Sequence, residues 1–271
     1  MTFHVLIKRL EDALAEEYGW AATPVSRSRL SSVVESKAKR LQIAAEEYCQ
    51  IAATSQSEML ALVEEAAASE TYFFREPQQF DLLRRVIVPG MLANRSGGDK
   101  LRIWSAACST GEEAYSLAIV LDALCASPGR GKVEIFATDV RNRALLVASE
   151  ARYKASTLKE LTTEERETYF TSPNADIFTV TPSIRRLVAF RRVNLLDQMF
   201  WKRMSGRYDL IVCTNLLTHL HGAAVRQMVS RLVKSLRQGG YLMVAPTENS
   251  YVENANLRPC KDAPTFFCRA A

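Results

Sequence analysis

The chain has 271 residues, of which 48% are hydrophobic and 24% are charged, a composition typical of a globular protein with a sizeable core. No apolar run approaches the roughly 20 residues that a membrane-spanning helix needs, and Lys8 and Arg9 follow a short apolar stretch at the N-terminus. We therefore expect a cytoplasmic protein that carries no secretory signal and does not insert into a membrane.

The net charge of +5 is unevenly distributed along the chain. Residues 1–70 contain 7 Lys/Arg and 11 Asp/Glu, a balance of −4, so residues 71–271 carry +9. This distribution favours an acidic partner or an anionic ligand. The sequence contains no basic stripe with interleaved aromatic residues, so we do not expect it to bind nucleic acid. The six cysteines form no C-x-x-C pair and the three histidines are poorly spaced, so we expect free thiols and no metal site.

The first 70 residues predict a small all-α domain. Apolar residues recur at three- and four-residue steps before Gly19: Phe3, Leu6, Leu10 and Leu14. Similar patterns predict a second helix over residues 28–47 and a third over 57–68. Five cations lie on or near the polar side of the second helix: Arg27, Arg29, Lys37, Lys39 and Arg40. They indicate either a docking surface for an acidic partner or an ordinary solvated face.

From residue 101 to residue 271, β-rich runs alternate with amphipathic helices, which predicts a doubly wound, Rossmann-like α/β domain. Residues 71–100 are expected to link it to the helical domain. The expected parallel strands are 101–108, 133–140, 208–214 and 241–245. The helix over 223–238 is expected to end at Gly239 and Gly240.

Two further segments are expected to pair antiparallel. Residues 265–268 predict an edge strand near the end of the chain. Residues 156–193 break the alternation of strands and helices, and the runs 177–181 and 187–193 flank a Pro-Ser turn. This pattern predicts a small β hairpin inserted into the α/β domain.

Polar residues follow three of the expected parallel strands, at the edge where an open α/β sheet binds its ligands. The first strand leads through a loop of small residues, 105–113, into a helix N-terminus. The second ends in Asp139, where a carboxylate can accept hydrogen bonds from ribose hydroxyls, and the last of the three ends in Thr214 and Asn215. Together these strand ends predict a nucleoside pocket.

Each of these features also has a purely structural interpretation. Thr110 and Glu113 fit a capping box, Asp139 could cap the following helix, and Asn215 could be an ordinary turn residue. The loop has a single glycine and lacks G-x-G-x-x-G, and the phosphate-binding G-x-x-x-x-G-K-[ST] motif is also missing. An adenosyl ligand without phosphates, such as S-adenosylmethionine, is therefore the better candidate.

Two runs of residues strongly resemble the chemotaxis-receptor glutamate methyltransferase family, CheR: TYFFRE at 71–76 and LRIWSAACSTGEEAYS at 101–116. The runs IFATD at 135–139, VNLL at 193–196 and YDLIVC at 208–213 continue the match in order. The resemblance covers nearly the whole chain. It implies transfer of a methyl group from S-adenosylmethionine to glutamate side chains of a chemoreceptor, without a metal.

The resemblance also implies which residues form the site. The cofactor is expected to contact Ser69, Thr71, Arg75, Glu113, Asp139, Asn194, Leu195, Thr214 and Asn215, although the family usually has Asn at the position of Ser69. Arg75 is expected to orient the acceptor carboxylate, which is ionised at neutral pH and needs no general base. Phe73 and Phe74 are expected to pack in the core, and a surface ion pair is the alternative for Arg75.

The sequence departs from the family pattern near the expected methyl-transfer site. Thr214 and His219 stand where the family usually has arginine and tyrosine, and residues 245–248 read APTE where it has a Gly-His-Ser-Glu type of segment. We expect His219 to be catalytic, beside the sulfonium; a solvent-facing histidine is the alternative. The departures leave open a rival class, a catalytically weakened module that binds S-adenosylmethionine or a receptor, and a small-molecule methyltransferase.

The expected partner is the cytoplasmic helical domain of a methyl-accepting receptor. Family members that are tethered to a receptor pentapeptide have a longer, glycine-rich loop in the inserted hairpin. The loop 171–176 is short and contains no glycine, which predicts that the protein acts without the tether. We also expect a monomer.

Overall fold

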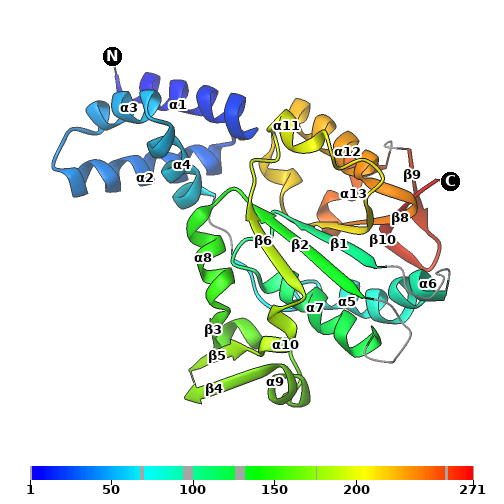
Figure 1. The fold of residues 1–271 in the computed structure, drawn as a ribbon. Helices are drawn as coiled ribbons and strands as arrows, with labels where there is room; N and C mark the ends of the chain where they lie inside the picture. Colours follow the sequence, from blue (N-terminus) through cyan, green and yellow to red (C-terminus); the bar gives the residue numbers. More distant parts are fainter. Residues whose placement is uncertain are drawn as a thin grey trace.

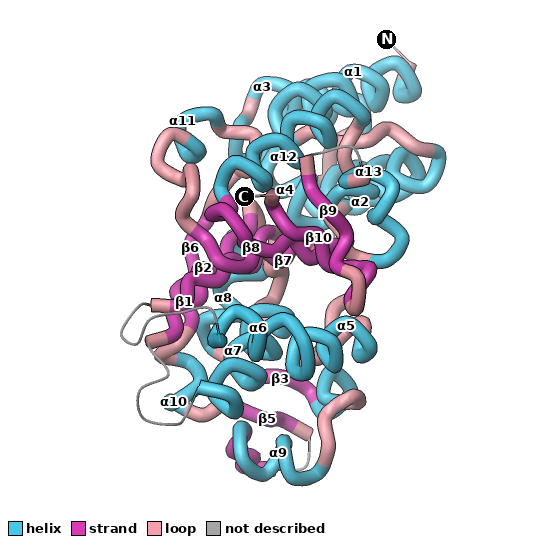
Figure 2. The backbone as a smooth tube through the Cα atoms, turned by 90° about the vertical axis from the view of Figure 1, so that its right-hand side faces the viewer, coloured by secondary structure: helices cyan, strands magenta, loops and turns pink. Residues whose placement is uncertain are grey.

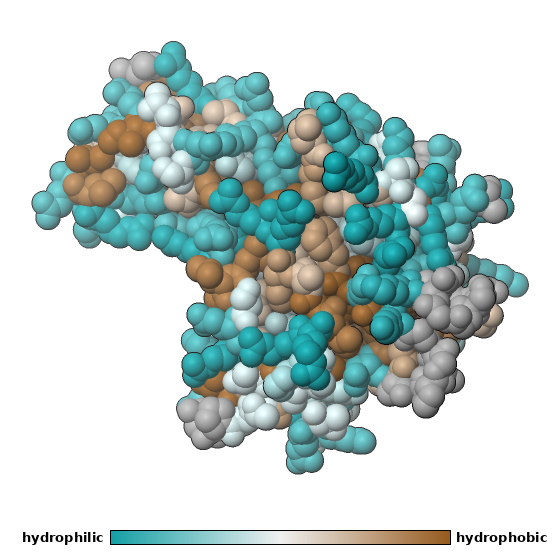
Figure 3. All heavy atoms as spheres, in the orientation of Figure 1, coloured by the Kyte–Doolittle hydropathy of each residue, from teal (hydrophilic) through white to brown (hydrophobic). Residues whose placement is uncertain are grey.

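The computed structural model describes residues 2–67, 70–93, 100–125, 132–174, 176–253 and 256–270 (Figure 1). A helical N-terminal region lies against one end of a larger α/β body. In Figure 3 the outline is hollowed between these two parts, and the visible face of the helical region is largely polar. Among the described residues, no helix combines the length and the apolar character needed to cross a bilayer.

Residues 2–67 contain four helices: α1 (Phe3–Tyr18), α2 (Pro24–Leu41), α3 (Ala45–Thr54) and α4 (Gln56–Ala66). Leu6, Leu10 and Leu14 of α1 are buried in a core that these helices share, so the apolar stripe predicts this packing correctly. The single second helix expected over 28–47 is wrong. Gln42 adopts a left-handed φ of 58° that closes α2, and α3 starts again at Ala45.

The main sheet of the α/β body has the strand order β6-β2-β1-β7-β8-β10-β9. Its strands are β1 (Leu101–Ala106), β2 (Val133–Asp139), β6 (Val188–Arg192), β7 (Tyr208–Cys213), β8 (Leu236–Val244), β9 (Leu257–Cys260) and β10 (Ala263–Arg269). The first five in this order run parallel, and β10 is antiparallel to both β8 and β9. Along the chain these parallel strands alternate with helices, as the sequence predicts.

Helices cover both faces of this sheet (Figure 2). They are α5 (Pro77–Leu82), the π-helical η1 (Leu83–Ile87), α6 (Val88–Ala93), α7 (Glu112–Cys125), α8 (Asn142–Glu150), α11 (Gln198–Trp201), α12 (Gly222–Ser235) and α13 (Asn249–Val252). Seen edge-on, α5, α6 and α7 lie on one side of the sheet and α12 and α13 on the other. The expected doubly wound, Rossmann-like α/β fold is thereby confirmed.

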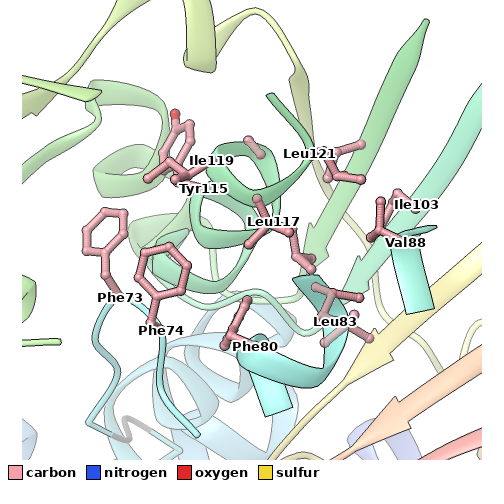
Figure 4. Packing of buried hydrophobic residues seen from close by; sticks show 14 of the residues in the cluster. Phe73, Phe74, Phe80, Leu83, Val88, Ile103, Tyr115, Leu117, Ile119 and Leu121 are labelled. Atoms are coloured by element: carbon pink, nitrogen blue, oxygen red, sulfur yellow. The ribbon is translucent and has the colours of Figure 1, made fainter. Parts of the chain in front are cut away.

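Residues 71–93, within the segment expected to link the domains, pack into the core of the α/β body. Phe73 and Phe74 are buried beside Tyr115 and Leu117 of α7 (Figure 4). The backbone N–H of Phe74 also donates to the Ser116 hydroxyl at 2.9 Å. The expected packing role of both phenylalanines is confirmed, and it anchors the TYFFRE segment on α7.

A second, three-stranded sheet of order β3-β5-β4 forms the inserted unit, with β3 (Arg152–Lys154), β4 (Phe170–Asn174) and β5 (Ile177–Val180). The helices η2 (Ala155–Leu158), α9 (Thr163–Tyr169) and α10 (Pro182–Arg185) flank it. The insertion is antiparallel, as expected, but its second predicted strand is wrong. Residues 188–192 form β6, which pairs parallel with β2 because Val188 and Phe190 pack against the main core.

The end of the sheet differs from the expectation in two details. Helix α12 ends at Ser235, and Gly239 and Gly240 lie inside β8. A Cβ at Gly240 would lie 3.0 Å from the carbonyl oxygens of Arg237 and Tyr208, so a glycine lets the irregular strand approach its neighbour. The expected edge strand, β10, pairs antiparallel as predicted, but β9 covers its outer edge.

Candidate cofactor and methyl-transfer site

The carboxyl ends of β1, β2 and β7 surround one cavity, which also reaches the helical domain. The cavity brings together most of the residues expected at the site: Thr71, Arg75, Glu113, Asp139, Asn194, Leu195, Thr214, Asn215 and His219. Ser69 lies outside the residues that the structure describes. Because parallel strands of one sheet end at the same edge, Asp139 and Thr214 both line this cavity although they are 75 positions apart in the sequence.

The loop after β1 is shaped by unusual backbone angles. Ala107 and Ser109 have φ values of 64° and 52°, and Gly111 has a φ of 95°. A Cβ at Gly111 would lie 2.8 Å from the Ala148 Cβ atom of α8, so only glycine fits between this loop and the helix. The loop thereby curls back against the strand ends, with Ala107, Cys108 and Ser109 in the cavity wall.

Asp139 is buried at the end of β2 and is held by its neighbours. Its Oδ2 atom accepts the Ser109 N–H at 2.8 Å, and its Oδ1 atom accepts both the backbone N–H and the Nε–H of Arg141, at 2.9 and 3.2 Å. A carboxylate oxygen has two lone pairs, so Oδ2 keeps one for a ligand. Helix α8 begins only at Asn142, and the Arg143 N–H in its first turn bonds to Glu64 instead.

Glu113 does not form the capping box that its spacing from Thr110 suggests. Helix α7 begins at Glu112, and the Glu113 carboxylate accepts the hydroxyls of Ser105 at 2.6 Å and Thr214 at 2.5 Å. Burial raises the pKa of this carboxyl to about 7, with a further contribution from Glu248, although both hydroxyls and Arg75 act in the opposite direction. Each carboxylate oxygen keeps one lone pair, so an ammonium group is a suitable ligand.

Arg75 is fixed in the cavity by two neutral acceptors. Its Nη1 atom donates to the Glu70 carbonyl oxygen at 2.6 Å, and its Nη2 atom donates to Asn215 Oδ1 at 3.2 Å. A guanidinium has five N–H donors, so these bonds orient the group and leave three donors for a ligand. No ion pair of Arg75 with a carboxylate is found in the described parts of the chain, so the surface ion pair is not the reason for its position.

Glu248 positions the loop that carries Asn215, and the sequence patterns do not reveal this role. Its buried carboxylate accepts the backbone N–H groups of Asn215 at 2.8 Å, Ala245 at 3.2 Å and Thr218 at 3.2 Å. Asn215 itself has a left-handed φ of 58°. The only signal in the sequence is that 245–248 keeps the glutamate of the family segment while its other residues differ.

Asn194 and Leu195 follow β6 and also line the cavity. The Asn194 amide is already engaged, since Nδ2 donates to the Glu17 carbonyl at 2.9 Å and Oδ1 accepts the Leu196 N–H at 2.9 Å. This side chain ties the end of α1 to the α/β body. A cofactor contact at these two residues would therefore use mainly the backbone and the Leu195 side chain.

His219 lies in the short helix η3 (Leu217–His219), with its side chain open to solvent at the cavity wall. Partial desolvation lowers the pKa of its imidazole below the usual 6.5, and the positive charges of Arg29, Arg141 and Arg75 lower it further. The lowered pKa favours the neutral imidazole. His219 therefore faces both the solvent and the cavity.

Metal binding has no structural support in the described ranges. They contain no group of three or more His, Cys, Asp or Glu side chains that could hold an ion. All six cysteines are free thiols.

Residues 69–265 match the family model described as "CheR methyltransferase, SAM binding domain". A chemotaxis protein methyltransferase of Listeria innocua is 36% identical over 176 residues, which is 65% of this chain but only 63% of that relative. Chemotaxis protein methyltransferase 1 of Pseudomonas aeruginosa is 32% identical over 77% of this chain and 76% of its own length. The relative from Salmonella typhimurium is 34% identical, over 71% and 65% respectively. The chain therefore belongs to the CheR methyltransferase family and has an S-adenosylmethionine-binding domain.

Proposed function

We propose that this protein transfers a methyl group from S-adenosylmethionine to glutamate side-chain carboxylates of a chemoreceptor-like protein, giving glutamate methyl ester and S-adenosylhomocysteine. The observation that carries this proposal is the orientation of Arg75. Its guanidinium is fixed in the cavity by uncharged acceptors and keeps both its positive charge and three free donors. Such a group suits the recognition of a carboxylate.

The residues around the cavity fit the cofactor. Asp139 offers a free lone pair to the ribose hydroxyls, and Glu113 offers two to the amino group of the methionine part. Thr71 and Asn215 complete the wall around Arg75. The negative charges of these two carboxylates would also attract the cationic cofactor. When bound, the cofactor would supply an electrophilic methyl group on a sulfonium sulfur.

The reaction asks little acid–base chemistry of the protein. A glutamate carboxylate has an ordinary pKa of about 4.3, so it is already ionised and nucleophilic at neutral pH. Bound S-adenosylmethionine would supply the methyl group: the carboxylate oxygen would form the new C–O bond as the C–S bond breaks, with the sulfur left as the neutral thioether of S-adenosylhomocysteine. Arg75 would hold the carboxylate in line with that methyl group, so catalysis is mainly positioning.

The two departures from the family pattern take different roles in this proposal. The Thr214 hydroxyl donates to Glu113 and so serves the cofactor side of the cavity, not the acceptor. The neutral imidazole of His219 would pack beside the methyl-transfer site without repelling the cationic cofactor. Because its pKa lies below 6.5, any loss of activity through its protonation should appear only at more acidic pH than an unperturbed histidine would give.

The proposed acceptor is the cytoplasmic helical domain of a receptor, bound by a monomer without a pentapeptide tether. The β4–β5 connection supports the absence of a tether, since β4 extends to Asn174 and β5 starts at Ile177. So short a connection leaves little chain to hold a peptide.

Transfer of labelled methyl from S-adenosylmethionine to receptor-containing membranes tests the proposal. We expect base-labile label on receptor glutamates, released as methanol by mild alkali. Cofactor binding without any transfer would instead support the rival class, a weakened binding module, which Thr214 and His219 favour. Label found only in small soluble compounds would support a small-molecule methyltransferase.

A further inference from the structure

The helical domain forms part of the wall of the cofactor cavity. Tyr18 and Trp20 at the end of α1, and Val63 and Ala67 at the end of α4, line it together with Asp139 of the α/β body. None of these four helical-domain residues belongs to the motifs that predict a cofactor site.

The end of α1 is held firmly against the α/β body. The Gly19 carbonyl accepts the His221 N–H at 2.9 Å, and the Ala21 N–H donates to the His219 carbonyl at 2.9 Å. Gly19 has a φ of 72°, and a Cβ there would lie 3.0 Å from the Ala224 Cβ atom, so only glycine allows this close approach. Trp20, between these two bonds, therefore has a fixed position in the cavity wall.

Trp20 differs from the other two tryptophans of the chain in its indole N–H. Trp104 donates this hydrogen to Thr138 Oγ1 at 3.0 Å, and Trp201 donates it to the Leu195 carbonyl at 2.8 Å. The Trp20 side chain is as buried as a core residue, with 7% of its surface exposed, yet its Nε1 atom has no acceptor in the described parts of the chain. A buried donor without a partner is costly, and a native protein seldom keeps one without a reason.

We propose that Trp20 is a further cofactor-binding residue, and that its indole N–H donates a hydrogen bond to the adenosyl part of the bound cofactor. The ligand class follows from Asp139, which lies in the same cavity and suits a ribose. The proposal rests on the cofactor part of the proposed function and is independent of the methyl acceptor. It makes the helical domain a component of the cofactor site.

Replacement of Trp20 with phenylalanine tests this role, because the substitution keeps an aromatic ring and removes the N–H. We expect Trp20→Phe to weaken the binding of S-adenosylhomocysteine, measured by calorimetry, by about three- to tenfold, the range for one neutral hydrogen bond. Tyr48→Phe is a matched control in the same helical domain. Tyr48 is buried and donates to Glu58 at 2.5 Å but does not line the cavity, so its loss should lower stability and leave affinity unchanged.

The indole resonances of the ¹⁵N-labelled wild-type protein give a readout that does not depend on the folding of a variant. We expect saturating S-adenosylhomocysteine to move the Trp20 N–H signal downfield, while that of Trp104, which already has an acceptor, moves little. An unshifted Trp20 signal, or unchanged affinity in folded Trp20→Phe, would overturn the proposal. Neither result bears on methyl transfer to glutamate, so failure here is distinguishable from failure of the proposed function.

Discussion

Two cationic regions of the protein differ in what surrounds their charges. On α2, Arg27 pairs with the buried Glu11 through two bonds of 2.9 Å, and Lys37 lies 3.2 Å from Glu58. In the cavity, Arg75 is held by a carbonyl and an amide oxygen instead. The charges on α2 are thus largely neutralised within the helical domain, whereas the charge of Arg75 remains available to a ligand.

This difference shows why a count of cations is a poor guide to a binding surface. Arg40 also pairs with Glu65, so three of the five cations of α2 stabilise the helical domain. Of these five cations, only Arg29 and Lys39 have no acidic partner in the part of the chain that the structure describes. Arg75, a single residue, offers a better anion site because neutral hydrogen-bond acceptors orient a cation without cancelling its charge.

The largest effect is expected for Arg75→Ala. Removal of one preorganised charge at a reacting centre costs about 2.7–4 kcal/mol in the barrier, roughly a 100- to 1,000-fold loss of single-turnover rate. Arg84→Ala is the matched control from the same segment, because Arg84 pairs with Glu165 at 2.5 Å and does not line the cavity. A near-normal rate in Arg75→Ala would make Arg75 a purely structural residue.

The next effect concerns two buried aspartates at opposite ends of the parallel strands. Asp139→Asn should weaken S-adenosylhomocysteine binding by about tenfold or more, since a hydrogen bond to a charged group contributes about 1.5–3 kcal/mol. Asp209→Asn is the control, because Asp209 lies near the start of β7 and accepts the Arg102 N–H at 2.7 Å. It should reduce stability alone. Equal affinity in wild type and Asp139→Asn would remove Asp139 from the site.

A pH dependence is expected from Glu113, because burial raises the pKa of its carboxyl to about 7. A cationic cofactor favours the ionised carboxylate, so its affinity should fall by up to about tenfold for each pH unit below 7. The stability of the empty protein should have the opposite trend, since the raised pKa contributes stability at low pH that is lost as the pH rises through 7. Calorimetry and thermal melts from about pH 5.5 to 7.5 measure both trends.

Two variants identify the titrating group. Glu113→Gln should remove the pH dependence of the cofactor affinity, and His219→Tyr should leave this pH dependence unchanged. If His219→Tyr removes the pH dependence instead, the imidazole is the source.

The smallest effect is expected on α2. Arg29→Glu with Lys39→Glu should raise the apparent Michaelis constant for receptor modestly and flatten its salt dependence. Lys37→Glu is not a clean test of docking, because it would place a carboxylate beside Glu58 and Glu65 and destabilise the helical domain. If the double variant changes neither quantity, docking uses another surface.

The sequence could predict the cavity because its main groups follow strands. Asp139 ends one apolar strand and Thr214 directly follows another, and parallel strands bring such positions together whatever the details of the helices. The helix break at Gln42 and the irregularity at Gly240 were missed, since both depend on local backbone angles that no apolar period records.

Other features depend on contacts between distant parts of the chain. The backbone of Trp20 bridges that of Leu220, and Glu248 holds the backbone of Asn215. Neither pair belongs to one motif or has a characteristic spacing, so the sequence alone does not predict that these residues contact each other. The strand at 188–192 was assigned to the wrong sheet for the same reason, because its partner, β2, lies about 50 residues earlier.

In the proposed reaction Asn215 would help to orient Arg75 toward the acceptor carboxylate, and a double-mutant cycle on single-turnover methyl transfer tests this role most directly. Asn215→Gly keeps the left-handed backbone at φ 58° and removes the acceptor of Arg75. We predict that Asn215→Gly slows transfer in the wild type and has little further effect in Arg75→Ala, a coupling of about 0.5–3 kcal/mol. Losses that simply add would contradict the account.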